Sequence, residues 1–217
     1  MSIFGIRQGD VRQPDEGKRY EPFGLWVFLV LALVIMVLAR REHYLLFHTM
    51  AEIIAIMVNF SIFSLVWTAR RQLSNHYLTL LGSAYGAIGL VDIFHALTFK
   101  GMTLLPDVTT NYPTQLWLIA RLIEAVAVVL APLLIRCQLG FMRPALAFGL
   151  VGGIGVLSVF KGWLPPTFED GVGLTPFKIV TEYVIIGLTL VGMVLLWRQR
   201  GQFTKKVFWL LVGSLSS

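Results

Sequence analysis

The chain has 217 residues, of which 56% are hydrophobic and only 14% are charged, with a formal net charge of +6. Soluble domains are about 25% charged, so this chain has too few polar groups to cover a folded surface in water, and its solvent must be a lipid bilayer. The positive charge does not indicate nucleic-acid binding, because the basic residues cluster between apolar runs, as in the cytoplasmic loops of membrane proteins.

The apolar runs predict an all-α, polytopic bundle of about seven transmembrane helices, preceded by a polar N-terminal tail over residues 1–21. The first run ends at Arg40-Arg41 without a small-residue cleavage site, which indicates an uncleaved helix and not a signal peptide. The expected spans are Pro22–Ala39, Tyr44–Trp67, Tyr77–Phe99, Thr114–Ile135, Pro144–Phe160, Pro176–Trp197 and the segment from Phe203 onward.

The seventh segment ends at Ser216-Ser217 after about fourteen residues, short of the roughly 20 that a membrane helix needs. We therefore expect residues 22–217 to be a transmembrane domain that stops before its last helix and before any domain that follows. The only cysteine, Cys137, excludes an internal disulfide and a cysteine-based metal cage.

The distribution of lysine and arginine predicts the orientation of the chain in the membrane. If the N-terminus is cytoplasmic, twelve of these residues lie on the cytoplasmic side and five on the outside, while Arg121 lies within a span. Short cytoplasmic loops are enriched in lysine and arginine. The sequence therefore predicts a multi-pass protein with a cytoplasmic N-terminus.

Four of the expected spans carry polar or ionisable side chains at helical spacing. Such ionisable groups cost about 2.5–3.5 kcal/mol each at the centre of a membrane helix and usually mark a functional site. Spacings of three or four residues place them on one helix face. The candidate ligand-binding residues are His48 and Glu52 in the second span, Asp92 and His95 in the third, Trp117, Arg121 and Glu124 in the fourth, and Lys178 and Glu182 in the sixth.

In the predicted orientation, all these residues fall in the outer half of the bilayer, which indicates one polar pocket open to the outside. Its four carboxylates exceed its cations, Arg121 and Lys178, by two, or by three if Lys178 lies outside the membrane. Because unpaired charge is costly in a membrane, protons, a metal cation, a cationic ligand or water must compensate the surplus.

Two interpretations of these polar residues remain open. In the first, Arg121 pairs with Asp92 or Glu124, His95 is hydrogen-bonded, and the group only holds helices together. In the second, the pocket binds a ligand. Imidazoles and carboxylates suit zinc, copper or iron, so the metal candidates are His48, Glu52, Asp92 and His95, and haem held between His48 and His95 is a second cofactor hypothesis.

The same residues carry a resemblance to a known family, the membrane-associated sensor domains of the third type (MASE type 3), over nearly the whole chain from about His43. The matching motifs are Phe47-His48-Thr49 with Glu52, Trp67 with Arg70-Arg71, Asp92-Ile93-Phe94-His95 followed by Lys100-Gly101-Met102, Pro113-Thr114-Gln115-Leu116-Trp117, Arg121 with Glu124, and Gly171-Val172-Gly173-Leu174-Thr175-Pro176-Phe177-Lys178 leading to Glu182-Tyr183.

The resemblance implies a sensory input domain in the cytoplasmic (inner) membrane of a bacterium. Such domains precede the kinase of two-component systems (a histidine kinase) or a diguanylate cyclase in the same longer chain, so the partners expected are the bilayer and a cytoplasmic output domain, and a homodimer is a candidate assembly. The sensor itself is expected not to be an enzyme. The alternatives are a metal- or haem-binding membrane redox protein and a small transporter.

Overall fold

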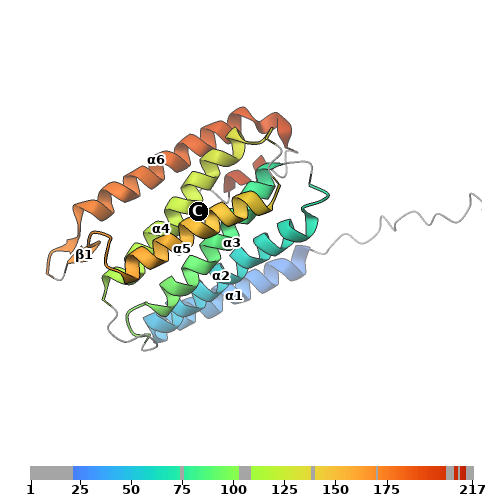
Figure 1. Ribbon diagram of the computed structural model, residues 1–217. Coiled ribbons are helices and arrows are strands. Elements are labelled where there is room, and N and C mark those ends of the chain that lie inside the picture. The colour runs from blue at the N-terminus through green and yellow to red at the C-terminus, as the bar shows by residue number, and fades with distance from the viewer. Residues whose placement is uncertain are drawn as a thin grey trace, which may run out of the picture. The chain divides into compact units, whose positions relative to one another are not determined.

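The computed structural model describes residues 22–73, 76–102, 109–137, 140–169, 171–203, 208–209 and 211–213 (Figure 1). The chain divides into two compact units, Met1–His48 and Thr49–Ser217, and each is described by itself. The tail over residues 1–21 and most of the expected seventh span lie outside the described residues.

The described chain is almost entirely helical, which confirms the predicted fold class. The elements are α1 (Pro22–Glu42), α2 (Tyr44–Ala69), α3 (His76–Leu97), α4 (Asn111–Leu133), α5 (Met142–Phe160), β1 (Phe168–Glu169), β2 (Gly173–Leu174), α6 (Pro176–Arg198) and the 3-10 helix η1 (Arg200–Gln202). The second to sixth expected spans therefore coincide with α2 to α6.

Five helices of the described chain, α2 to α6, are long and apolar enough to cross a membrane. The predicted number of about seven is larger than this count. The first expected span does form a helix, the 21-residue α1, but it is not one of these five. The polytopic bundle is thus established, and the two further spans stay predictions.

Helix α4 is the centre of the second unit, because it packs against α3, α5 and α6, while α3 also packs against α5. Small residues allow the close approach of these helices. A Cβ atom on Gly82 of α3 would lie 2.5 Å from the Val66 side chain of α2, and one on Gly192 of α6 would lie 2.5 Å from the Val128 side chain of α4. Glycines therefore allow α2 to pack closely against α3 and α6 to pack closely against α4.

The loop between α5 and α6 contains a two-stranded antiparallel hairpin, in which Phe168 lies opposite Leu174. The side-chain oxygen of Asn111, the first residue of α4, accepts hydrogen bonds from the backbone N–H groups of Thr167 (2.7 Å) and Phe168 (2.8 Å). Thr175 then caps α6 by accepting from the backbone N–H of Lys178. The hairpin thus holds the first turns of α4 and α6 at one end of this unit.

Candidate functional site

The candidate site is built around His95, which lies in the last turn of α3 and is only 6% exposed. Its Nε2 atom lies 3.4 Å from Oε1 of Glu52 on α2. Its Nδ1 atom lies 2.7 Å from the backbone carbonyl oxygen of Pro113, in the first turn of α4. One imidazole ring therefore joins three helices.

The Pro113 contact determines the proton arrangement on the His95 ring. A carbonyl oxygen can only accept a hydrogen bond, so Nδ1 must carry a proton and donate it. The Nε2 atom then faces the Glu52 carboxylate. If the ring is neutral, two lone-pair groups oppose each other, so this geometry requires a proton or another cation between Nε2 and the carboxylate.

A second buried polar contact lies deeper between the same two helices. Asp92 is 4% exposed, and its Oδ2 accepts a hydrogen bond of 2.8 Å from the side-chain amide of Asn59 on α2. Asp92 precedes His95 by one turn of α3, and it interacts electrostatically with Glu52, His95, Arg121 and Glu124. The Asn59–Asp92 and Glu52–His95 contacts together form a polar seam between α2 and α3.

The polar residues of α4 form a group of their own. Arg121 makes an ion pair with Glu124 one turn further along the helix, and Glu124 also accepts a hydrogen bond of 3.3 Å from the Tyr85 hydroxyl of α3. Both charged side chains are partly exposed. The arginine therefore neutralises Glu124, and Asp92 has the Asn59 amide as its hydrogen-bonded partner.

A third group joins α4 to α6. The ammonium of Lys178 lies 2.7 Å from Oε1 of Glu182, four residues later on α6, and 5.6 Å from the ring centroid of Trp117 on α4. These two ion pairs use both cations of the predicted set. The carboxylates of Glu52 and Asp92 lie in the seam, where the titratable ring of His95 faces Glu52.

The ninth predicted residue, His48, lies one helical turn before Glu52 in α2. It belongs to the first compact unit, where its ring stacks on Tyr44 with centroids 6.2 Å apart. Within Thr49–Ser217, the site therefore consists of three groups: the seam, the Arg121 group and the Lys178 group. The sequence alone predicts one pocket that contains all of them.

Besides Asn59, which donates to Asp92, two contributors to the site were not among the predicted residues. The Pro113 carbonyl orients His95, but a backbone oxygen carries no mark in the sequence. The Tyr85 hydroxyl reaches Glu124, and tyrosine is too common in apolar segments to stand out. The only available signal for Pro113 was its position at the start of the motif that ends in Trp117.

Comparison with known proteins gives one match. The family described as MASE3, membrane-associated sensor domain, matches residues 39–217. No curated protein and no solved structure matches the chain. The matched region contains all nine residues of the predicted site.

Proposed function

Because the chain belongs to the MASE3 family of membrane-associated sensor domains, we propose that it is the sensory input domain of a bacterial signalling protein of the cytoplasmic membrane. Its stimulus acts on the Glu52–His95 centre, and its N-terminus is cytoplasmic. The signal passes to a kinase or cyclase output domain in the same longer chain. The observation that carries this proposal is a buried imidazole that faces a carboxylate across a helix interface.

The stimulus that suits this centre best is a transition-metal ion. Two ligands bonded to a tetrahedral zinc ion at about 2.0–2.1 Å stand about 3.4 Å apart, which is the separation between His95 Nε2 and Glu52 Oε1. Histidine ligands of metals usually donate their other N–H to a carbonyl or carboxylate, and Nδ1 of His95 does so to Pro113. Distance and tautomer therefore agree with metal ligation through Nε2.

The proposed ligands are therefore Glu52 and His95, which belong to one compact unit, whereas His48 belongs to the other. Asp92 would remain a neighbouring anion, since its Oδ2 is occupied by Asn59. Haem is a weaker candidate than a bare ion, because the Glu52 carboxylate already occupies the space in front of His95 Nε2. The competing interpretation is a proton shared between Glu52 and His95 that only joins the helices.

Signal transfer would use the seam between α2 and α3. Glu52 lies near the start of α2, and Asn59 lies two turns deeper on the same helix. A cation added between Glu52 and His95 changes the charge that holds α2 against α3, and such local changes bias how helices pack. The resulting shift of α2 would be the output of the domain.

Metal analysis of the detergent-purified protein tests the proposal. We expect about one zinc, copper, iron or manganese per chain, and we expect His95→Ala and Glu52→Gln to lose it. His76→Ala is the matched control, because His76 is the first residue of the same helix and lies at its opposite end. A wild-type protein that takes up no metal when these ions are supplied would refute the metal stimulus.

A second pair of variants separates metal ligation from helix joining. The side-chain nitrogen of asparagine takes the position of His95 Nδ1, which contacts Pro113, whereas that of glutamine takes the position of Nε2, which faces Glu52. His95→Asn should keep the α3–α4 contact and lose metal. If His95→Gln retains the signalling of the wild type in the longer protein with its output domain, the imidazole is not needed as a ligand. A hydrogen bond to Glu52 is then sufficient.

A further inference from the structure

A polar cavity lies at the other end of the bundle from His95, where α4 and α6 end. It has a volume of about 260 Å³, several times the roughly 30 Å³ that one water occupies in the liquid. Its lining consists of Leu133, Ile135, Arg136, Arg198, Gln199, Gly201 and Gln202. Among the described residues, no aspartate or glutamate lines this cavity, so its charge is positive.

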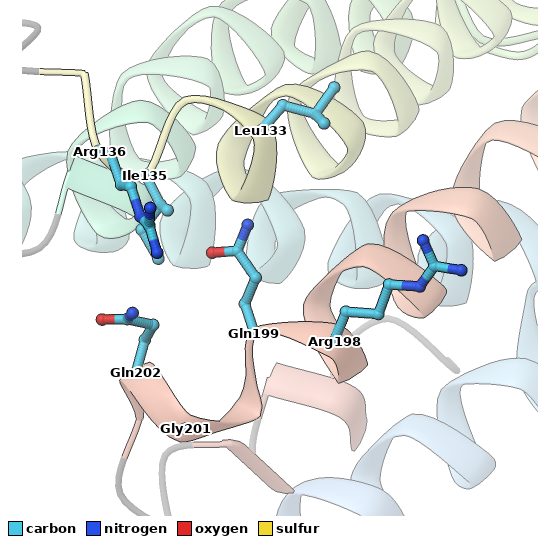
Figure 2. A pocket seen from close by; sticks show the side chains of 7 residues that line it. All are labelled: Leu133, Ile135, Arg136, Arg198, Gln199, Gly201 and Gln202. Atoms are coloured by element: carbon cyan, nitrogen blue, oxygen red, sulfur yellow. The ribbon is translucent and has the colours of Figure 1, made fainter.

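Figure 2 shows how these side chains lie. The Arg136 guanidinium is directed toward Gln202, and the Gln199 side chain rises between the ends of the two helices. Arg198 extends away from Arg136 on the far side of the cavity. In the described part of the chain, neither Arg136 nor Arg198 has an acidic ion-pair partner.

The ordinary explanation for arginine here is that it neutralises the carbonyl groups at helix ends. This explains Arg198, which lies in the last turn of α6. It explains Arg136 less well, because two carbonyl groups in the last turn of α4 already accept hydrogen bonds from other donors. The Gln199 amide donates to the Pro132 carbonyl, and the backbone N–H of Leu134 donates to the Leu130 carbonyl.

An aromatic groove adjoins the cavity and shares Gly201 with it. This groove has a volume of about 500 Å³ and is lined by Trp197, Arg200, Gly201, Phe203, Phe208 and Trp209. Arg200 stacks over the Trp197 ring at 5.4 Å and so already has a partner. Tryptophan typically lies at the level of lipid headgroups, so a cationic cavity and an apolar groove meet where a membrane lipid changes from headgroup to acyl chain.

We propose that the cavity between the ends of α4 and α6 binds the phosphate of an anionic phospholipid. Arg136 binds the phosphate oxygens with the amide of Gln202 beside it, and the first carbons of the acyl chains lie along the aromatic groove. Basic pockets between membrane helices bind anionic headgroups in this way. The proposal is independent of the Glu52–His95 centre, which lies at the opposite end of α4.

Native mass spectrometry of the purified protein, loaded with phosphatidylglycerol or with phosphatidylcholine, tests the proposal. We expect selective retention of phosphatidylglycerol, reduced about fivefold by Arg136→Gln. Because Arg198 extends away, Arg198→Gln should reduce retention less, about twofold. Arg143→Gln is the matched control, since Arg143 is an exposed arginine near the start of α5 that does not line the cavity.

Equal losses in Arg136→Gln and Arg143→Gln would mean that surface charge alone retains the lipid, and would overturn the proposal. Displacement of phosphatidylglycerol by millimolar glycerol 3-phosphate would identify a soluble anion as the ligand and would overturn the lipid source. If Arg136→Gln fails to fold, Gln202→Glu tests the same cavity. Its carboxylate would pair with Arg136 and should expel the lipid, and unchanged retention would overturn the proposal.

Discussion

The Asn59 amide of α2 donates a 2.8 Å hydrogen bond to the Asp92 carboxylate of α3, and both residues are less than a tenth exposed. A charged or strongly polar group at this depth of an apolar bundle is costly unless it has a partner. The contact therefore pairs a buried acceptor of α3 with a donor of the neighbouring helix α2.

Replacing Asn59 by leucine should lower the free energy of unfolding by about 1–2 kcal/mol, because Asp92 loses its hydrogen-bonded amide. Unfolding in mixed micelles of detergent and SDS measures this change. Ser61→Ala is the matched control on the same helix, since Ser61 donates only to the Met57 carbonyl of its own helix and is exposed. Its effect should stay below about 0.5 kcal/mol. Strictly additive effects of Asn59→Leu and Asp92→Leu in the double variant would contradict the contact.

The seating of α6 on α4 should be sensitive to one glycine and insensitive to another. A Cβ atom on Gly192 would lie 2.5 Å from Val128 Cγ1 and 2.9 Å from the Val128 carbonyl oxygen, which a side-chain rotation cannot move away. Gly192→Ala should therefore destabilise the protein by about 1–3 kcal/mol. Gly187→Ala on the same helix meets nothing within 4 Å and should be neutral or slightly stabilising. The same SDS titration decides, and equal effects of the two substitutions would refute the close approach.

The Lys178–Glu182 pair should tolerate exchange of its two charges better than reversal of one charge. Lys178→Glu places two carboxylates one turn apart on α6 and should cost about 1 kcal/mol of unfolding free energy. Adding Glu182→Lys restores the ion pair but removes the cation from its place 5.6 Å from the Trp117 ring. The double variant should thus recover most of the loss and retain a deficit of about 0.5 kcal/mol. A double variant less stable than Lys178→Glu would show that the ion pair contributes nothing.

The orientation can be tested on the native protein without mutation. Cys137 is exposed just beyond the C-terminal end of α4, and the predicted topology places this end in the cytoplasm. A membrane-impermeant maleimide should therefore label Cys137 in inverted vesicles and leave it unlabelled in intact spheroplasts. Cys137→Ser combined with Trp163→Cys gives the reverse control, since Trp163 is 67% exposed beyond the C-terminal end of α5. Labelling of Cys137 from outside would invert the proposed orientation.

The sequence alone was sufficient to predict that the protein lies in a membrane and where helices α2 to α6 begin and end. These depend on long apolar runs, and in a bilayer every backbone group of a spanning segment must be satisfied within a helix. The boundaries agree closely: α6 begins at the predicted Pro176 and ends one residue after the predicted Trp197. The polar residues were also identifiable, because each interrupts an apolar run.

Only the tertiary structure decided which partner each polar residue takes. Spacing left Arg121 a choice between Asp92 and Glu124, and in the structure it pairs with Glu124, one turn further along its own helix. Asp92 turns instead to Asn59, and His95 turns to Glu52 and to the Pro113 carbonyl. Such choices depend on how each helix is rotated about its axis and how close its neighbours come. The distance between helices depends on close contacts at glycines, and the partner of His95 depends on a backbone oxygen of another helix. A hydropathy pattern contains no information on either contact.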